Sequence, residues 1–150
     1  MDKKIMYLDM DGVLTDFDAA VAMCSPGLRA AYVGEYDNIP GLFGIMPPLP
    51  GAVSAYEALA EVFDVYLLST APWDNPSAWS DKVEWINRYL PPSARKRLIL
   101  SAHKHLNVGD YLVDDRPHKN GAERFSGTVI HFGSDEYPNW QIALPKILQL

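Results

Sequence analysis

Five short runs rich in apolar residues constrain the fold of this chain more than any other feature. They cover residues 5–8, 65–68, 98–100, 111–113 and 128–132, and in most of them apolar side chains follow one another without alternating with polar ones. Such runs are typical of strands covered on both faces, as in a parallel sheet. Their short length and their β-branched and aromatic residues favour strands over buried helix fragments.

Helical patterns separate several of these runs. Apolar residues recur every three or four positions in two segments: Ala52, Tyr56, Leu59 and Phe63, and then Trp79, Val83, Ile86 and Leu90. A further helix is expected from Asn139, with Pro145 bending it or opening a second turn. Strands that alternate with helices predict right-handed crossovers and an α/β fold with a doubly wound, mostly parallel sheet. The 150 residues are the size of a single domain.

The segment from about 19 to 50 does not fit this alternation. Glycines and prolines interrupt it, and it is too long for an ordinary connection between two elements. It also contains apolar residues, among them Tyr32, Leu42 and Phe43, which a disordered loop would not need. We therefore expect a small lid or cap inserted after the first strand.

Charge and cysteine content exclude several classes of protein. The formal net charge of −6 argues against a protein that binds a nucleic acid duplex, because that function calls for a basic face. Cys24 is the single cysteine, which excludes a disulfide framework and a cysteine-based zinc site. The sequence has neither a signal peptide nor a membrane-spanning stretch, so we expect a cytoplasmic protein with no membrane partner. Nothing in it indicates an oligomeric state.

Residues whose side chains can take part in catalysis or bind a metal follow four of the expected strands. Asp9 and Asp11 close the first run, with Gly12 permitting a tight turn directly after them, and Asp114 and Asp115 close the fourth. Carboxylates gathered at one sheet edge repel one another, and Mg²⁺ is a natural remedy because it binds carboxylates and phosphate oxygens together. The hydroxyls of Ser69 and Thr70 follow the second strand, and Lys104 follows the third. Both positions suit contacts with a phosphate group.

Each of these features has an ordinary explanation when it is taken alone. An Asp-x-Asp pair is usually a solvated turn, Asp114-Asp115 could open a turn before Pro117, and Lys104 could be a surface lysine. Their joint occurrence, each at the carboxyl end of a predicted strand, is what favours a functional site, because ligands bind there in open α/β sheets.

The stretch from Asp9 to Asp16 resembles the first motif of the haloacid dehalogenase (HAD) superfamily of phosphotransferases. More narrowly, the chain resembles the 5′(3′)-deoxyribonucleotidases over most of its length, through four stretches: 9–17, 48–53, 69–72 and 112–117. This resemblance implies a Rossmann-like HAD fold and a Mg²⁺-dependent phosphomonoester hydrolase. The implied substrate is a small phosphomonoester, with (deoxy)nucleoside monophosphates as the leading class.

The resemblance also implies roles for individual residues. Asp9 is the expected nucleophile, which forms an aspartyl-phosphate, and Asp11 is the expected general acid and base. Mg²⁺ is expected on the Asp9 carboxylate, the Asp11 main-chain oxygen and one acid of the Asp114–Asp115 pair, with Asp115 preferred as the direct ligand. Thr70 and Lys104 are expected to bind the phosphate oxygens. Phe17 and Phe43 match aromatic positions of the family and are expected to contact the substrate, although packing in the core or lid is the simpler explanation of both.

Two departures from the family pattern keep other functions open. Ala71 replaces a hydroxyl residue that usually follows the threonine, and the insert looks shorter than the family's helical cap. A short cap leaves the site open, so a HAD phosphatase acting on sugar phosphates or on a phosphorylated macromolecule end is an alternative. Receiver-like signalling modules, which gather acids, a hydroxyl and a lysine around Mg²⁺, are an alternative from another class. Their acids, however, occur in a different order along the chain.

Overall fold

The structure is a computed structural model that describes residues 2–150, and its strands form one parallel sheet. The strands are β1 (Ile5–Leu8), β2 (Asp64–Ser69), β3 (Leu98–Leu100), β4 (Tyr111–Asp114) and β5 (Thr128–His131). All five coincide with the apolar runs. Their spatial order is β3-β2-β1-β4-β5, which confirms the predicted doubly wound sheet.

The strand order reverses beside β1. The chain builds outward from β1 through β2 to β3, and then returns to the other side of β1 to build β4 and β5. Leu8, near the end of β1, lies opposite Leu67 of β2 and Val113 of β4. The residues that follow β1 and β4 therefore emerge side by side at the switch point of the sheet, where open α/β sheets form their ligand crevice.

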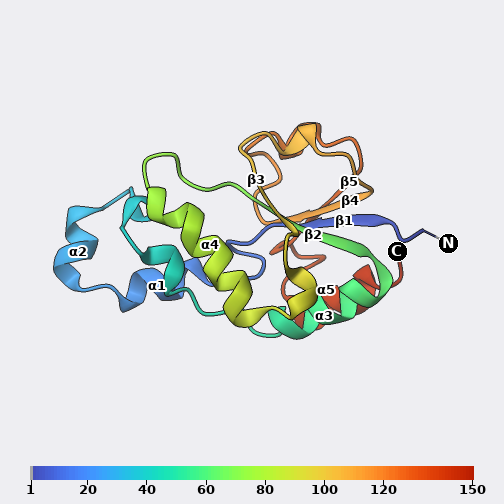
Figure 1. Ribbon diagram of the computed structural model, residues 1–150, viewed down its shortest axis with the longest axis horizontal. Coiled ribbons are helices and arrows are strands. Elements are labelled where there is room, and N and C mark those ends of the chain that lie inside the picture. Colours follow the sequence, from blue (N-terminus) through green and yellow to red (C-terminus); the bar gives the residue numbers. More distant parts are fainter. Residues whose placement is uncertain (1) are drawn as a thin grey trace.

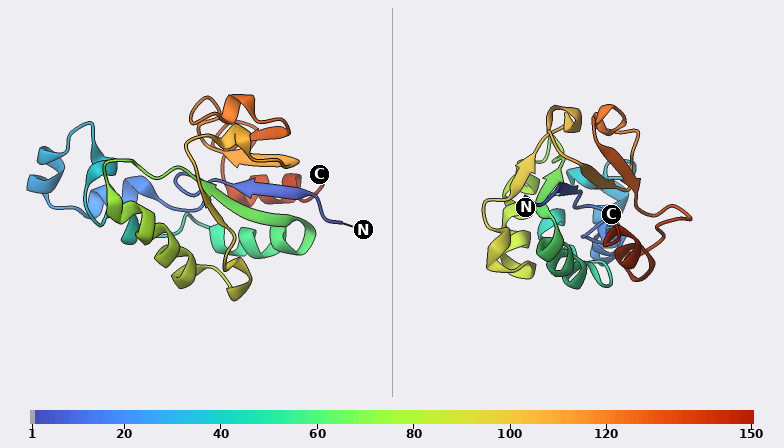
Figure 2. Two further views of the ribbon diagram at one scale, coloured as in Figure 1. Left: turned by 45° about the horizontal axis from the view of Figure 1, so that its top comes forward. Right: turned by 90° about the vertical axis from the view of Figure 1, so that its right-hand side faces the viewer.

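Unequal layers cover the two faces of the sheet (Figures 1 and 2). Helices α3 (Ala52–Val62), α4 (Pro76–Tyr89) and α5 (Trp140–Ile147) pack on one face and enclose the larger core. The other face carries a smaller apolar cluster that includes Leu68, Leu112 and Phe125. It is covered by two short 3-10 helices, η4 (Lys104–Leu106) and η5 (Ala122–Arg124). Cover on both sides explains why the strand sequences run apolar without alternation.

The segment between β1 and α3 is folded and lies beyond the carboxyl ends of the strands (Figure 1). It contains the helices α1 (Phe17–Met23) and α2 (Pro26–Ala31) and the 3-10 helices η1 (Tyr36–Asn38) and η2 (Leu42–Gly44). Asp16 and Ser25 accept hydrogen bonds from backbone N–H groups at the starts of α1 and α2, respectively. Phe43 and Met46 are buried in the larger core, so the C-terminal part of the segment packs against the rest of the domain. We call residues 17–50 the cap.

Helix α4 begins at Pro76 and ends before Pro91, as its flanking residues predict, but its buried face differs from the expected one. Val83 is 48% exposed, whereas Lys82 and Trp85 point inward. The indole N–H of Trp85 donates to the Met46 carbonyl at 2.9 Å, which explains its position. The inward turn of Lys82 depends on a partner outside the helix, described below. In residues 2–150 no helix is long and apolar enough to cross a membrane.

Helix α5 also has the start that its sequence indicates. The Asn139 side chain accepts a hydrogen bond from the Ile142 N–H at 3.0 Å and so caps the helix. Pro145 lies inside the helix, two residues before its last residue, and does not open a separate turn. Trp140 at the start of α5 donates its indole N–H to the Val13 carbonyl at 2.6 Å. This bond ties the C-terminal helix to the loop that follows β1.

Candidate active site

The loop after β1 is wound tightly around one carbonyl group. The Met10 carbonyl accepts hydrogen bonds from the N–H groups of Val13, Leu14 and Thr15 at 2.7–3.1 Å. Gly12 sits in the left-handed region with a φ of 82°, and a Cβ atom added to it would overlap the Asp115 carboxylate. A glycine at this position therefore allows the β1 loop to approach the acids that follow β4.

Three carboxylates meet where β1 and β4 end. Asp9, Asp114 and Asp115 each offer an oxygen within 4.8 Å of the other two, and Asp9 and Asp114 are buried. The Lys104 ammonium lies 3.1 Å from an Asp9 oxygen and 2.7 Å from an Asp114 oxygen. Three carboxylates face one ammonium, so the cluster carries a surplus of two negative charges when all four groups are ionised.

This surplus shifts the acidity of the buried groups. Burial and the neighbouring carboxylates raise the pKa of Asp9 well above its ordinary value, although the Lys104 ammonium opposes the rise. Burial likewise raises the pKa of Asp115. Burial alone would lower the pKa of Lys104, but the charges of Asp9 and Asp114 outweigh it and raise that pKa, so the lysine stays protonated. A further cation would relieve the remaining repulsion.

The donor set fits Mg²⁺, and the hydrogen bonds distinguish the two acids after β4. Both Asp114 oxygens are engaged: one pairs with Lys104 and the other accepts the Arg116 N–H at 2.9 Å. One Asp115 oxygen is buried and has no hydrogen-bond partner among the described residues. A buried carboxylate oxygen without a partner is a group that a cation would satisfy. Asp115 is therefore the better placed of the two to bind a metal directly, with Asp114 as its support.

Asp11 lies apart from the three clustered acids and has partners of its own. One of its carboxylate oxygens lies 2.8 Å from the ammonium of Lys82, which comes from α4, and the other accepts the hydroxyl of Thr15 at 2.8 Å. The sequence motifs indicated neither partner. Thr15 is recognisable only once the loop is known to fold back on itself. Lys82 carries no motif signal, because it lies in a helix whose apolar spacing pointed to its neighbour.

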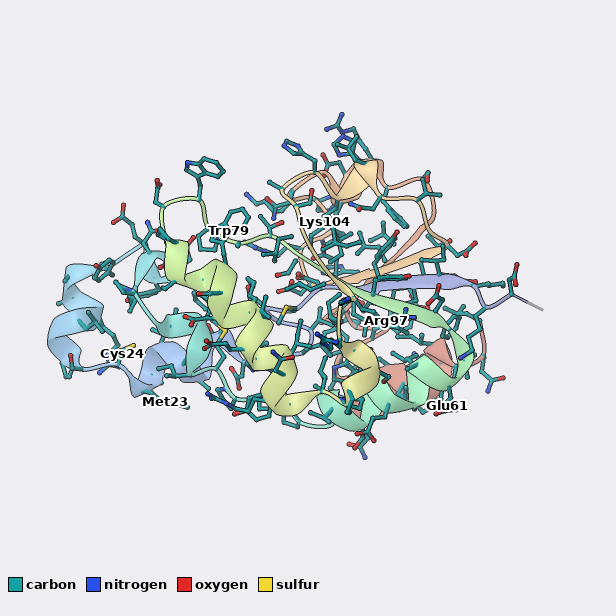
Figure 3. The ribbon with its side chains drawn as sticks, in the orientation of Figure 1. Met23, Cys24, Glu61, Trp79, Arg97 and Lys104 are labelled. Atoms are coloured by element: carbon teal, nitrogen blue, oxygen red, sulfur yellow. The ribbon has the colours of Figure 1, made fainter. Side chains whose placement is uncertain are left out.

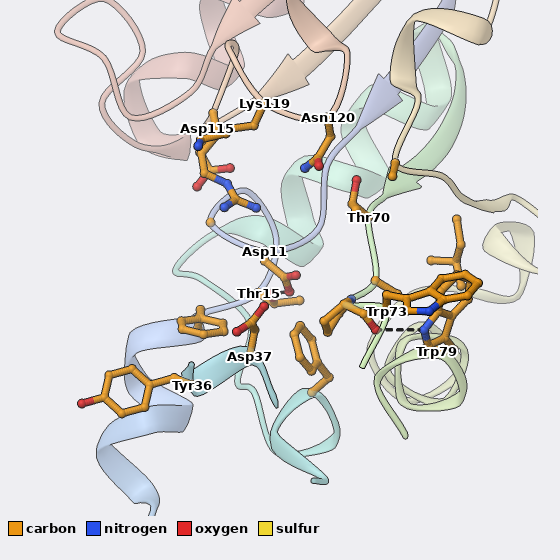
Figure 4. A pocket seen from close by; sticks show the side chains of 18 of the residues that line it. Asp11, Thr15, Tyr36, Asp37, Thr70, Trp73, Trp79, Asp115, Lys119 and Asn120 are labelled. Carbon is orange, nitrogen blue, oxygen red and sulfur yellow. Dashed lines mark hydrogen bonds between the residues drawn. The ribbon is translucent and has the colours of Figure 1, made fainter. Parts of the chain in front are cut away.

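Asp11 and Thr70 line one cavity of about 1200 Å³ (Figure 4). The Thr70 hydroxyl donates to the Ser101 carbonyl at 2.7 Å. Lys104, expected to share the phosphate with Thr70, lies beside the Asp9 and Asp114 carboxylates, 2% exposed, on the η4 side of the sheet (Figure 3). The structure thus brings together six of the seven acidic, hydroxyl and lysine residues singled out from the sequence: Asp9, Asp11, Thr70, Lys104, Asp114 and Asp115. The seventh, Ser69, is fully buried and does not line the cavity.

Aromatic side chains form two walls of the same cavity. On the cap side, Phe17 and Phe43 meet edge to face with ring centroids 6.2 Å apart, and Tyr36 lies nearby. On the opposite side stand Trp73, which is 84% exposed, and Trp79, again 6.2 Å between centroids (Figure 4). The space between these walls suits a flat, apolar group attached to a phosphate held near the acids.

Comparisons with known proteins agree with this geometry. Residues 25–141 match the family described as "5' nucleotidase, deoxy (Pyrimidine), cytosolic type C protein". A proposed 5'(3')-deoxyribonucleotidase of Vibrio phage KVP40 is 55% identical over 139 residues, covering 93% of this chain and 81% of that protein. A proposed 5'(3')-deoxyribonucleotidase of Bordetella pertussis is 34% identical over 145 residues, covering 80% and 78%.

A solved structure supports the fold. The proposed HAD hydrolase YfnB from Bacillus subtilis, crystallised with magnesium, superimposes with a TM-score of 0.67 at 12% identity over the full length of both chains. The Rossmann-like HAD fold expected from the sequence is thereby confirmed, and the receiver-like alternative is set aside. With its site, its relatives and its fold in agreement, this chain belongs to the cytosolic type C 5′-nucleotidase family and is a hydrolase of the phosphatase class.

Proposed function

We propose that the protein is a Mg²⁺-dependent 5′(3′)-deoxyribonucleotidase that releases phosphate from (deoxy)nucleoside monophosphates in the cytoplasm. The observation that carries the proposal is the cluster of Asp9, Asp114 and Asp115, in which Lys104 pairs with the first two and Asp115 borders a cavity with aromatic walls. The carboxylate cluster suits a metal and a phosphate, and the aromatic walls suit a base. The names of the relatives point to the same substrate class.

The proposed chemistry uses two carboxylates. The Asp9 oxygen attacks phosphorus, the bond from phosphorus to the leaving oxygen breaks, and Asp11 gives its proton to the departing alcohol. Asp11, now a carboxylate, takes a proton from a water molecule that attacks the aspartyl-phosphate. This step releases inorganic phosphate and restores Asp9. Mg²⁺, held by Asp9, the Asp11 main-chain oxygen and Asp115, would screen the repulsion between the nucleophile and the phosphate dianion.

Other residues hold the substrate in place. Lys104 and the Thr70 hydroxyl are proposed to contact the phosphate oxygens, the lysine through the ammonium that also neutralises Asp9 and Asp114. Phe17 is proposed to stack on the nucleoside, under a cap that covers it only in part. Phe43, also expected to contact the substrate, is 3% exposed and packs edge to face behind Phe17, so we propose that it supports this wall of the cavity. Ala71 offers no hydroxyl, so at that position any phosphate contact comes from the main chain.

A phosphate-release screen tests the proposal. Purified protein with Mg²⁺ is given deoxynucleoside and ribonucleoside 5′- and 3′-monophosphates, sugar phosphates and a 5′-phosphorylated oligonucleotide, each with a chelator control. The proposal expects the highest kcat/KM among the nucleoside monophosphates and no turnover in chelator. Higher kcat/KM for sugar phosphates or for the oligonucleotide end would replace the nucleotidase assignment with the corresponding alternative. Turnover that persists in chelator would exclude the proposed requirement for Mg²⁺.

A further inference from the structure

Lys82 is the most unexpected charged residue of the molecule. It stands on the inward face of α4 with 1% of its side chain exposed, a position that the helical repeat would fill with an apolar residue. Its ammonium lies 2.8 Å from one Asp11 carboxylate oxygen, and this is its single ion pair among the described residues. Its second close neighbour is the Phe43 ring, with 4.6 Å between the nitrogen and the ring centroid.

Stability alone does not account for a lysine here. Taking an ammonium out of water is costly, and replacing a buried ion pair with apolar side chains of similar volume is often neutral or stabilising. Asp11 does not depend on Lys82 for solvation, because 21% of its side chain is exposed toward the cavity. The pair therefore points to a requirement of the reaction.

The hydrogen bonds around Asp11 indicate that requirement. Thr15 donates to one carboxylate oxygen from within the β1 loop, and Lys82 donates to the other from α4, so two elements fix the plane of the carboxyl group. An ammonium donates hydrogen bonds and accepts none. Lys82 can therefore only donate to Asp11, and the Thr15 hydroxyl holds the other carboxylate oxygen, so these two contacts orient the exposed part of the carboxyl group toward the cavity where the leaving alcohol would stand.

The cap holds Lys82 in turn. Phe43 in η2 presents its ring to the Lys82 ammonium, a favourable arrangement for a buried cation, and packs edge to face against Phe17 at the cavity wall. Asp11, Lys82, Phe43 and Phe17 thus form one continuous line of contacts from the acid to the wall where a nucleoside would lie.

We infer that Lys82 is a positioning residue for proton transfer: it holds the Asp11 carboxyl in the orientation that delivers its proton to the leaving alcohol. Lys82 does not itself contact the substrate. This inference rests on the proposed phosphatase mechanism, in which Asp11 is the general acid, and does not depend on the substrate being a nucleotide.

A comparison of leaving groups tests it. A nucleoside or sugar leaves as an alkoxide that needs a proton, whereas p-nitrophenol leaves as a stable anion that does not. The value of kcat/KM covers the steps up to departure of the alcohol, so it reports proton donation separately from the later attack of water. Because general acid catalysis contributes roughly 10²–10⁴-fold, Lys82→Met should lower kcat/KM for a deoxynucleoside monophosphate by on the order of 10- to 100-fold. The value for p-nitrophenyl phosphate should fall far less.

Two further variants keep the test specific. Ile86→Val, also on the buried face of α4, trims one methylene and destabilises the helix packing without touching Asp11. It should leave unchanged the ratio of kcat/KM for the deoxynucleoside monophosphate to kcat/KM for p-nitrophenyl phosphate. Lys82→Gln retains an N–H donor on a shorter stem and should lower the ratio less than Lys82→Met does. Should Lys82→Met not fold, Lys82→Gln carries the test.

The outcomes separate the inference from the proposed function. A selective loss with the alkyl substrate supports the positioning role. An equal loss with both substrates, accompanied by a lower melting temperature, or no loss with either, overturns it and leaves Lys82 a packing residue. If the wild-type protein hydrolyses no nucleotide, the nucleotidase proposal fails. The same comparison is then made with ribose 5-phosphate as the alkyl substrate, and its result still decides the role of Lys82.

Discussion

Replacing Lys104 with methionine removes the one cation that stands among three carboxylates. The ammonium is 2% exposed and pairs with Asp9 at 3.1 Å and Asp114 at 2.7 Å, so the variant leaves buried negative charge without a partner. Removing one member of a buried ion pair costs about 3–5 kcal/mol. For a chain of this length, 1 kcal/mol lowers the melting temperature by about 2–4 °C, so Lys104→Met should melt about 6–20 °C below the wild type without metal.

Thermal unfolding followed by circular dichroism, in chelator and then in saturating Mg²⁺, measures this loss. We expect Mg²⁺ to recover part of it, because the metal supplies positive charge beside the same carboxylates. Lys119→Met is the matched control: Lys119 lines the cavity but is exposed, and its loss should shift the melting temperature by no more than about 1–2 °C. A Lys104→Met protein that melts within 2 °C of wild type in chelator would refute the reasoning, and the lysine would then contribute nothing to the charge balance of the fold.

The remaining predictions concern the acids and the cap. Asp9→Asn should lower turnover at least about 10³-fold. Its melting temperature in chelator should stay level or rise, because the amide cannot ionise at a site where burial and neighbouring carboxylates disfavour a negative charge; a clear fall in stability would contradict this. In chelator, the unfolding free energy of the wild type relative to that of Asp9→Asn should decrease as pH rises above 3.8. The reason is the raised pKa of Asp9, because of which the folded state keeps a proton that the unfolded state has already lost. Saturating Mg²⁺ should remove this pH dependence. Phe17→Ala should lower kcat/KM for nucleoside monophosphates by about 10- to 100-fold, as expected for the loss of one stacking contact, and leave sugar phosphates unaffected; equal effects on both would exclude stacking.

The sheet and the acidic cluster could be predicted from the sequence because both depend on local patterns. Continuous apolar runs identify strands that are covered on both faces. The residue that follows such a run therefore lies where the carboxyl ends of the parallel strands meet. Asp9 and Asp114 end two runs, so once β1 and β4 are neighbours their side chains meet. The caps and prolines around α4 and α5 set the helix bounds by equally local effects.

Lys82 and the burial of Lys104 could not be predicted in the same way. A lysine on a helix is normally solvated, and what turns Lys82 inward is Asp11, 71 residues earlier in the chain. The helical repeat therefore favoured Val83, which is exposed in the structure. Lys104 is likewise paired with Asp114, 10 residues later in the chain, and with Asp9, which approaches it only through the fold. Long-range charge pairing of this kind leaves no periodic signal in the sequence.

The cap lies between these two cases. Its apolar residues indicated a folded segment, and Phe43 and Met46 are indeed buried. Its short helices are too brief to show a full period, and their packing against α4 depends on tertiary contacts such as the bond from Trp85 to the Met46 carbonyl.

Trapping the phosphorylated enzyme tests the central claim most directly. The protein is mixed with Mg²⁺ and a deoxynucleoside monophosphate, quenched in acid during turnover and reduced with borohydride, which converts an aspartyl-phosphate to homoserine. Peptide mass spectrometry then locates the product. We expect homoserine at position 9 in the wild type, and none in Asp9→Asn, in chelator or without substrate. Homoserine at the position of another acidic residue would contradict covalent catalysis by Asp9. So would the absence of homoserine at position 9 in an enzyme that turns over rapidly and releases phosphate with inversion at phosphorus.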